Sequence, residues 1–108
     1  MQFVALHTRL RPGMEEAYEE THREVPAALV HDLKARGVVE WRIWRHGRDL
    51  FHLVECEDYA AFAAGPATNE TAETWGDRMD PYLEVQNDLS DPDRNMMRAV
   101  WTMTGNPQ

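Results

Sequence analysis

The stretch QFVALHTRL-RPG-MEEAYEETHREVPAALVHDLKAR, residues 2–36, decides the fold. Its first part, residues 2–10, alternates apolar and polar side chains, which is typical of a half-buried strand. The Arg-Pro-Gly segment at residues 11–13 breaks that strand. From Met14 to Arg36 apolar side chains recur every three or four residues, which predicts a helix. Strand, turn and long helix together predict the first half of a βαβ unit.

The helix expected over Met14–Arg36 has one apolar face and one interruption. Gly37 follows it directly, and glycine is common just past the end of a helix. Pro26 lies inside it, and its ring clashes with the carbonyl four residues back, that of His22. Either the helix is kinked beside His22, or a second helical segment begins at Pro26. The apolar face is formed by Met14, Tyr18, His22, Val25, Leu29 and Leu33.

Two further strands are expected, over Val39–Arg45 and Leu50–Cys56. The residues between them, His46-Gly47-Arg48-Asp49, favour a tight turn and therefore a hairpin. Side chains alternate along the first of these strands, with Trp41 and Ile43 on one face and Arg42 and Trp44 on the other.

The rest of the chain predicts a second helical region and a last strand. Asp58 is a good N-cap for a helix that is interrupted at Gly65-Pro66 and resumes over Glu70–Met79. An acidic loop is expected over Tyr82–Asn95, and a fourth strand over Met97–Met103. The order βαββαβ predicts one domain over residues 1–108, with a ferredoxin-like α+β fold, an antiparallel sheet and both helices on one face.

Helices on one face leave the other face of the sheet open. The aromatic residues that we expect there are Phe3, Trp41 or Trp44, and Trp101. Their exposure would cost several kcal/mol at ~25 cal/mol per Å² of apolar surface. A homodimer that packs two sheets face to face would cover them, whereas a monomer in sizing chromatography would exclude that arrangement.

Composition and charge describe an acidic globular domain. The chain has 108 residues, of which 43% are hydrophobic and 28% charged, and this excludes a disordered chain. With 11 basic and 19 acidic residues the formal net charge is −8, which disfavours binding to nucleic acid or an anionic membrane. Residues 1–50 are neutral, so the acidic excess falls on the second half. We interpret it as a solvated surface and not as a site for a cationic ligand. The pair Tyr18 and His22, beside aromatic residues, favours a small neutral ligand.

Signals for targeting, metals and nucleotides are sparse. The N-terminus lacks the basic segment and apolar run of a signal peptide, and no apolar run is long enough to span a bilayer. Cys56 is the only cysteine, so no intrachain disulfide can form and a cytoplasmic location is expected. No zinc-binding spacing of Cys or His and no glycine-rich phosphate loop occurs. We therefore expect no metal and no cofactor.

Two polar side chains interrupt the apolar face of the first helix. Tyr18 and His22 lie one turn apart, where a phenol and an imidazole need partners. Both could be satisfied structurally, His22 by a backbone carbonyl and Tyr18 at the edge of the core. Alternatively they form a site, because an imidazole with an unperturbed pKa of about 6.5 can give and take a proton at neutral pH.

Four tryptophans are many for so short a chain. We expect core or interface roles for Trp44 and Trp101. Trp75 lies late in the polar second helical region, and a tryptophan with one free face is a common platform for the C–H face of a sugar. Among the other histidines, His7 could share a cavity with His22, and the pattern leaves this open.

The stretch RLRPGMEEAYEETHREV, residues 9–25, resembles the opening of the L-rhamnose mutarotase family, which carries a Tyr-x-x-x-His pair on a helix. The resemblance continues through WRIW at 41–44, Glu73-x-Trp75 and AVWTM at 99–103, so it spans nearly the whole chain. It implies a dimeric α+β barrel whose members interconvert the α and β anomers of a deoxyhexose without a cofactor.

The resemblance also implies roles for four residues. His22 matches the acid/base histidine, and Tyr18 matches the tyrosine beside it. Trp75 matches the first of two tryptophans that line the sugar site, and Trp41 stands where tyrosine is usual. In the implied reaction a proton leaves the anomeric hydroxyl while another reaches the ring oxygen, and the opened sugar recloses from its other face.

Three departures from the family pattern concern the sugar pocket. Val25-Pro26-Ala27-Ala28 replaces Ile-Trp-Pro-Glu, Gly76 replaces the second tryptophan, and Trp41 replaces tyrosine. They leave proton transfer intact but open the choice of substrate to L-rhamnose, L-fucose or another 6-deoxy sugar.

Two other functions use similar residues. A cofactor-independent monooxygenase of the small α+β barrel type would also place His, Trp and Tyr between sheet and helix, and oxygen uptake with an anthrone-like compound would reveal it. A non-catalytic sugar-binding module would bind a sugar without changing its rate of anomer exchange. The ordered, near-full-length resemblance favours the mutarotase over the monooxygenase.

Overall fold

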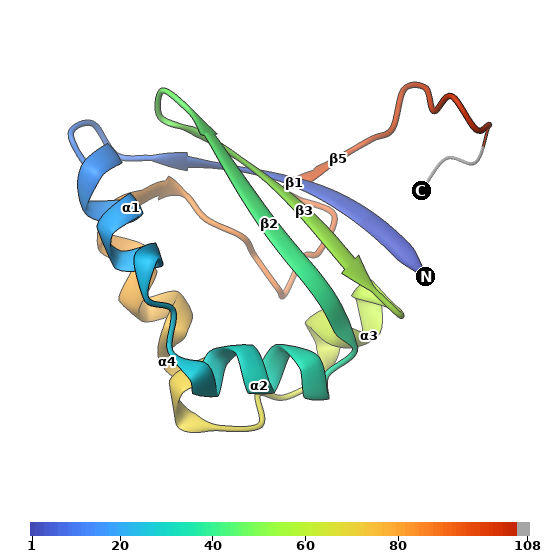
Figure 1. The fold of residues 1–108 in the computed structure, drawn as a ribbon, viewed down its shortest axis with the longest axis horizontal. Coiled ribbons are helices and arrows are strands. Elements are labelled where there is room, and N and C mark those ends of the chain that lie inside the picture. Colours follow the sequence, from blue (N-terminus) through green and yellow to red (C-terminus); the bar gives the residue numbers. More distant parts are fainter. Residues whose placement is uncertain (106–108) are drawn as a thin grey trace.

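The computed structural model describes residues 1–105, which form an antiparallel sheet with every helix on one of its faces (Figure 1). β1 (Gln2–Leu10) pairs with β3 (Asp49–Cys56), and β3 pairs with β2 (Val38–His46). The other edge of β1 pairs with two short strands, β4 (Leu83–Val85) and β5 (Met96–Met97). The resulting strand order is β2-β3-β1-β4. The predicted α+β class with an antiparallel sheet is confirmed, and the order is consistent with a ferredoxin-like fold.

The alternation predicted for the first strand decides which residues meet the helices. Val4, Leu6 and Leu10 are buried, and Thr8 joins them at 1% exposure. Phe3, on the opposite face, stays 39% exposed. The inward face of β1 therefore carries the core, which consists of two apolar clusters.

The first cluster joins the three long strands to the third helix, α3 (Tyr59–Ala64). It contains Val4, Leu6, Val38, Val54, Cys56, Tyr59 and Phe62. The second cluster lies at the other end of the sheet, under α1 (Glu15–Arg23) and α4 (Glu70–Met79). It contains Leu10, Tyr18, Leu50, Met79 and Leu83.

The single helix predicted over Met14–Arg36 is wrong, because the structure has two helices there. α1 (Glu15–Arg23) ends before Pro26, and α2 (Ala27–Ala35) begins after it. Proline lacks an N–H and disfavours helical backbone in the preceding residue. The Pro26 carbonyl instead accepts from the amide of Leu29 at 3.0 Å, as the first acceptor of α2. Of the two readings of Pro26, the second helical segment is the one observed.

The glycines before and after β2 lie where the sequence predicted the end of a helix and a tight turn. Gly37, with φ of 93°, directly follows the C-cap of α2 and leads into β2. Residues His46 and Asp49 pair across the sheet, which leaves a two-residue turn between β2 and β3. Gly47 opens that turn with φ of 62°, a backbone angle that glycine adopts readily.

The second helical region forms as predicted, in two pieces. α3 (Tyr59–Ala64) is capped by Asp58, whose carboxylate accepts from the amide of Ala61. After the Gly65-Pro66 interruption, α4 (Glu70–Met79) begins with Asn69 as its N-cap. A short 3-10 helix, η1 (Asp80–Tyr82), then leads into β4.

The fourth strand predicted over Met97–Met103 is wrong. The strand beside Leu10 is Leu83–Val85, which lies inside the segment predicted as a loop, and β5 ends at Met97. Leu83 is buried against the second cluster, whereas Val100, Trp101 and Met103 are 98%, 77% and 84% exposed. An alternating pattern alone does not reveal which segment has a surface to pack against.

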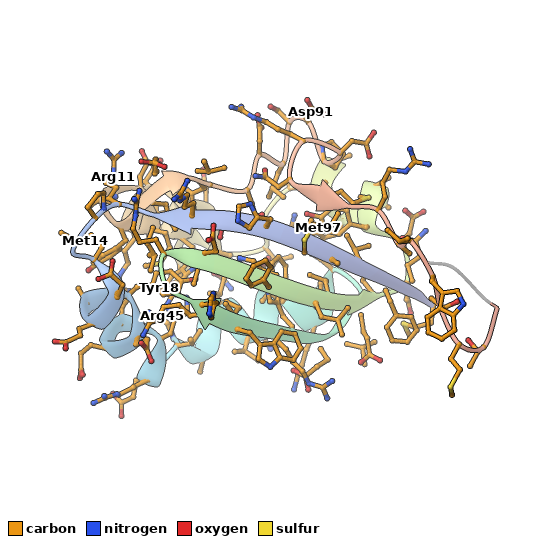
Figure 2. All side chains as sticks on the ribbon, turned by 90° about the horizontal axis from the view of Figure 1, so that it is seen from above. Arg11, Met14, Tyr18, Arg45, Asp91 and Met97 are labelled. Carbon is orange, nitrogen blue, oxygen red and sulfur yellow. The ribbon has the colours of Figure 1, made fainter. Side chains whose placement is uncertain are left out.

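The helix-free face of the sheet is seen from above in Figure 2. Trp44 is 54% exposed there, and its cross-strand neighbour Phe51 is half-buried. Trp41 lies on the opposite face, where its ring meets Phe62 with centroids 6.1 Å apart. Of the two tryptophans considered for the open face, Trp44 is therefore the one that lines it. Trp101 lies beyond β5, in a segment without regular structure.

Candidate active site

Tyr18 and His22 lie on successive turns of α1 and face the sheet. Their ring centroids are 4.1 Å apart with the planes tilted by 31°. Tyr18 is buried in the second cluster with Leu10 and Leu50, while His22 is half-buried. The 3.6-residue period of the helix places both rings on the side that packs against β3.

The hydrogen bond of His22 fixes its tautomer. Nδ1 lies 3.0 Å from the backbone carbonyl oxygen of Tyr18. A carbonyl only accepts, so Nδ1 carries the proton and Nε2 holds the lone pair of the neutral ring. Within residues 1–105 no group bonds Nε2. Burial lowers the pKa of His22, and the bond to Tyr18 opposes this only in part. At neutral pH His22 is therefore an uncharged base with one free nitrogen.

The hydroxyl of Tyr18 is also free to meet a ligand. Burial raises the pKa of Tyr18 to about 12, so the phenol keeps its proton at neutral pH. No hydrogen-bond partner for this hydroxyl occurs in the described part of the chain. A neutral phenol can donate a hydrogen bond to an oxygen atom that enters the site.

Trp75 of α4 completes an aromatic group with these two residues. Its ring meets His22 edge-on, with centroids 5.8 Å apart and the planes at 80°. The Arg78 guanidinium lies 5.3 Å from the Trp75 ring centroid. Beside it, a Cβ added at Gly76 would meet nothing within 4 Å, so this position opens onto free space. The structure thus brings together three of the four predicted site residues, namely Tyr18, His22 and Trp75.

A cavity of 250 Å³ opens between α1 and the sheet, next to this aromatic group. It is lined by Tyr18, Glu19, His22, Arg23, Ile43, Arg45 and Leu50. The carboxylate of Glu19 and the guanidinium of Arg45 form an ion pair of 2.8 Å at its edge. Pockets for drug-sized ligands span roughly 300–1,000 Å³, so this cavity suits a smaller ligand such as a monosaccharide.

A larger hollow, of 360 Å³, lies elsewhere, along β4 and the loop after it. It is lined by polar residues such as Arg11, Asp88 and Arg94, and none of the aromatic residues above reaches it. We place the site in the smaller cavity because a free base, a free hydroxyl and aromatic rings converge there.

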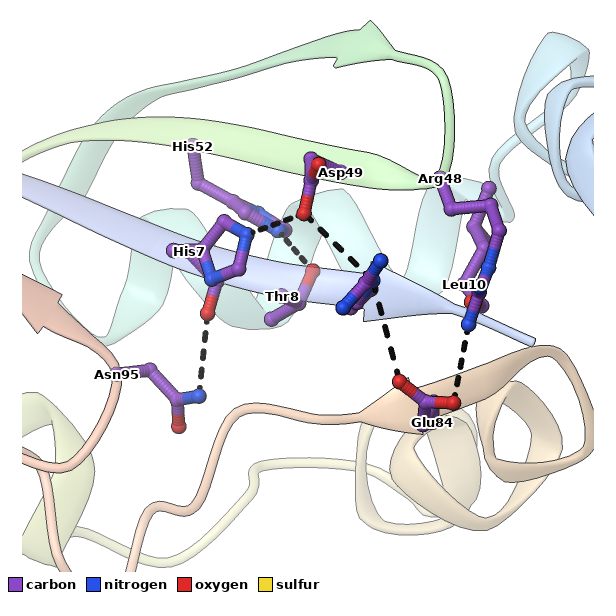
Figure 3. Close-up of polar contacts among 9 residues, drawn as sticks. His7, Thr8, Leu10, Arg48, Asp49, His52, Glu84 and Asn95 are labelled. Carbon is purple, nitrogen blue, oxygen red and sulfur yellow. Dashed lines mark hydrogen bonds and ion pairs between the residues drawn. The ribbon is translucent and has the colours of Figure 1, made fainter. Parts of the chain in front are cut away.

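Trp41, the fourth predicted site residue, is hydrogen-bonded to His52, a histidine for which the sequence suggested no role. Its indole Nε1–H donates to Nδ1 of His52 at 3.0 Å. Nε2 of His52 must then carry the proton, and it donates to Oγ1 of Thr8 at 2.9 Å (Figure 3). Burial, with smaller effects from His22 and His7, lowers the pKa of His52 to about 4.

His52 could have been found from the alternation of its own strand. It stands between Leu50 and Val54, both fully buried, at the same two-residue spacing. That spacing places the imidazole on the inward face, and the hairpin turn sets it beside Ile43 and near Trp41. The sequence does not reveal the acceptor role, which depends on the position of the indole across the strands.

His7 does not share the cavity with His22. Its Nε2 donates to the carboxylate of Asp49 at 2.8 Å, and its ring lies 5.5 Å from that of Phe51. Asn95 donates to the backbone carbonyl of His7 and anchors the loop before β5 (Figure 3). His7 therefore belongs to the outer face of the sheet.

Residues 1–105 contain neither a cluster of metal-binding side chains nor a membrane-spanning helix. No group of three or more His, Cys, Asp or Glu side chains is arranged there to hold a metal ion. No helix in that range is long and apolar enough to cross a membrane.

The chain is similar to known proteins along nearly its whole length. The family model described as L-rhamnose mutarotase matches residues 4–103. An L-rhamnose mutarotase of Opitutus terrae is 43% identical over 65 residues, which are 58% of this chain and 62% of that relative. The crystal structure of an L-rhamnose mutarotase from Formosa agariphila matches with a TM-score of 0.72 at 25% identity, covering 95% of this chain and 99% of the other. The chain belongs to the L-rhamnose mutarotase family.

Proposed function

We propose that the protein is a mutarotase that interconverts the α and β anomers of L-rhamnose or a closely related 6-deoxyhexose. The observation that carries this proposal is the state of His22, a neutral imidazole whose Nδ1 is held by Tyr18 and whose Nε2 is free beside a cavity of monosaccharide size. Family membership supports the same reaction.

The proposed mechanism opens and recloses the sugar ring. Nε2 of His22 takes the proton of the anomeric hydroxyl while the bond between C1 and the ring oxygen breaks, which leaves an aldehyde at C1. The ring oxygen receives a proton that the Tyr18 hydroxyl relays from water, and the aldehyde rotates about the C1–C2 bond. The hydroxyl then attacks the other face of C1 and gives its proton back to water through Tyr18, while the proton on His22 returns to the new anomeric oxygen. Every atom of the sugar is conserved.

Tyr18 assists this transfer mainly as a hydrogen-bond donor. Its raised pKa, about 12, makes the phenol a weak acid, so full release of its proton is unfavourable. A hydrogen bond from its hydroxyl to the ring oxygen would stabilise the negative charge that develops there as the ring opens. Tyr18 thereby polarises the bond that His22 helps to break, or relays a proton to it.

The walls of the site favour a sugar with an apolar side. Trp75, whose ring contacts His22, and Trp41, which lies two residues before the cavity residue Ile43, would border the cavity with indole rings, which pack well against sugar C–H groups. Ile43 and Leu50 add aliphatic surface to the cavity. A 6-deoxy sugar such as L-rhamnose or L-fucose carries a methyl group that such walls would accept. The free space beside Gly76 leaves more room there than a second tryptophan would.

We further propose that the protein acts as a cytoplasmic homodimer joined through the open faces of two sheets. The apolar side chains on that face include Phe3, Trp44, Phe51 and Leu53, with Phe3 and Trp44 39% and 54% exposed. Every helix lies on the other face, so a second copy of the sheet is the natural cover (Figure 1). The single cysteine, Cys56, suits a reducing compartment. Neither nucleic acid nor membrane is a proposed partner.

Anomer exchange measured by saturation-transfer NMR tests the proposed function. The panel comprises L-rhamnose, L-fucose and D-glucose, each with and without the protein. We expect faster exchange for one or both 6-deoxy sugars and little effect on glucose. Calorimetric binding of a sugar without faster exchange would instead indicate a binding module, and no effect on any sugar would exclude the proposal.

A further inference from the structure

The indole of Trp41 has no polar atom left for a ligand. Indole nitrogen is a donor only, and Nε1–H of Trp41 is already used by Nδ1 of His52 at 3.0 Å. The remaining surface of the ring is hydrocarbon. While this hydrogen bond is intact, Trp41 can offer a bound sugar an apolar surface and nothing else.

The acceptor is itself held rigidly by the sheet. His52 is 5% exposed and Thr8 is 1% exposed, and Nε2–H of the imidazole donates to Thr8 Oγ1 at 2.9 Å. Both nitrogens of the ring are therefore occupied in its neutral form. The chain Thr8–His52–Trp41 crosses three neighbouring strands, β1, β3 and β2. The direction of the indole is consequently set by strand register rather than by a mobile loop.

The chain lies beside two residues of the cavity lining, while Thr8, His52 and Trp41 are not themselves part of that lining. Ile43, which lines the cavity, pairs with His52 across the sheet, and Leu50, also in the lining, precedes His52 on the same face. Trp41 lies two residues before Ile43 on β2, so the two Cα atoms are roughly 7 Å apart along the strand. Arg45 lies on the other side of Ile43. The edge contacts with Phe62 and His52, at 6.1 Å and 6.0 Å between centroids, fix the ring on two sides.

We propose that His52 is a positioning residue that fixes Trp41 as an apolar end wall of the sugar site, so that the site accepts the methyl group of a 6-deoxyhexose and rejects the hydroxymethyl group of its 6-hydroxy counterpart. This inference rests on the mutarotase function proposed above and names the part of the molecule that selects the substrate class.

The selectivity follows from the hydrogen bonds that a methyl group or a hydroxyl group can form at the indole of Trp41. A methyl group placed against the indole loses no hydrogen bond. A hydroxyl placed there leaves water and finds neither donor nor acceptor, because Nε1–H is already used. A buried apolar wall of this kind discriminates against an added hydroxyl by about tenfold to a hundredfold. If His52 were replaced by an apolar residue, the released N–H could donate to that hydroxyl, and the indole could also turn.

The test compares two sugars and two substitutions at one position. L-rhamnose and L-mannose differ only by the hydroxyl on carbon 6. His52→Leu removes the acceptor at similar volume, whereas His52→Asn supplies a carbonyl oxygen close to the place of Nδ1. We expect His52→Leu to raise the KM for L-rhamnose more than it lowers kcat, and to reduce the preference for L-rhamnose over L-mannose in kcat/KM by about tenfold. His52→Asn should restore most of that preference.

A spectroscopic measurement reports on the hydrogen bond itself. The indole N–H of Trp41, assigned by its loss in Trp41→Phe, should move upfield in a ¹H–¹⁵N spectrum of His52→Leu and stay near its wild-type position in His52→Asn. If His52→Leu does not fold, Thr8→Val replaces it, because loss of the acceptor for Nε2–H destabilises the required tautomer. That variant should lower the sugar preference by about threefold.

The outcomes separate the two proposals. If the wild-type protein fails to accelerate exchange of any 6-deoxyhexose, the proposed function is wrong and this inference falls with it. If the wild type is active but the sugar preference is the same in His52→Leu, or in Thr8→Val where that variant is used, the function stands and the role of His52 is overturned.

Discussion

The imidazole of His22 donates from Nδ1 to the backbone carbonyl of Tyr18, one helical turn earlier, at 3.0 Å. This bond satisfies one nitrogen of a half-buried ring and at the same time leaves the lone pair on the other nitrogen. The structural and the catalytic interpretations of the pair are therefore compatible. The contact that stabilises His22 in α1 is also what prepares it as a base.

Tyr18→Phe should separate the catalytic hydroxyl from the packing of the ring. Because that hydroxyl has no hydrogen-bond partner within residues 1–105, its removal should change the free energy of unfolding by less than about 1 kcal/mol. Loss of the donor to the ring oxygen should lower kcat by about tenfold to a hundredfold. Urea denaturation and saturation-transfer NMR measure the two effects.

Tyr82→Phe is the matched control for that substitution. The Tyr82 hydroxyl lies outside the cavity and accepts a hydrogen bond from Thr21 at 3.3 Å. Its loss should leave anomer exchange near the wild-type rate. An equally fast Tyr18→Phe variant would remove Tyr18 from the mechanism.

His52 should make stability depend on pH. Its pKa is about 4 in the folded chain and about 6.5 when unfolded, so the unfolded state binds more protons between these values. Stability should be independent of His52 above pH 6.5, fall as the pH is lowered from about 6.5 to about 4, and lose about 3 kcal/mol in total. Urea denaturation across this range measures it.

The contribution of His52 is isolated by comparison with His52→Leu. Burial also lowers the pKa of His22, which faces the same region, and carboxyl groups titrate at the acidic end of the range. These contributions are present in both proteins and cancel in the difference. If the difference in unfolding free energy between the wild type and His52→Leu does not vary with pH, His52 is not the neutral ring with two hydrogen bonds that the structure describes.

Asp32→Ala should be strongly destabilising although Asp32 lies outside the site. Asp32 is fully buried in α2 and accepts from the amide and hydroxyl of Thr68 at 2.6 and 2.7 Å and from Arg36 at 3.1 Å. Burial opposes its ionisation, but these partners outweigh burial and lower its pKa. The substitution should cost about 3 kcal/mol in urea denaturation, because Arg36 is left without its counter-charge. Asp77→Ala, at an exposed site on α4, should cost less than about 0.5 kcal/mol.

Trp44→Asp should separate the proposed dimer into monomers. Trp44 is 54% exposed on the open face, where a charge would be buried against the second sheet. Sedimentation velocity should give a dimer for the wild type and a monomer for this variant. Val30→Asp, at a 39% exposed position on α2, should remain dimeric. A monomeric wild-type protein would exclude the proposed face-to-face dimer.

Much of the fold could be predicted because local signals agreed with the packing. Alternation in β1 predicted the buried face through Leu6 and Leu10, and Asp58 marked the start of α3. The spacing of Tyr18 and His22 predicted that they share a face, since helical periodicity alone determines it. These features depend on residues close together in the chain.

The features that could not be predicted depend on distant partners. Pro26 permitted both a kink and a break, and the local pattern did not distinguish them; the structure has the break, with α2 beginning after Pro26. The strand at Leu83 forms because Leu10 offers it a buried neighbour, which an acidic, proline-containing segment does not suggest. The bond between Trp41 and His52 requires the register of β2 against β3, and neither residue signals it alone.

The central claim is that Nε2 of His22 is the base that opens the sugar ring. Saturation-transfer NMR of L-rhamnose with the wild type, His22→Ala and His22→Asn tests it most directly, with His46→Ala as a control at an exposed histidine. We predict exchange that is about 10²–10⁴-fold slower in both His22 variants and unchanged in His46→Ala. Exchange as fast in His22→Ala as in the wild type would contradict the account.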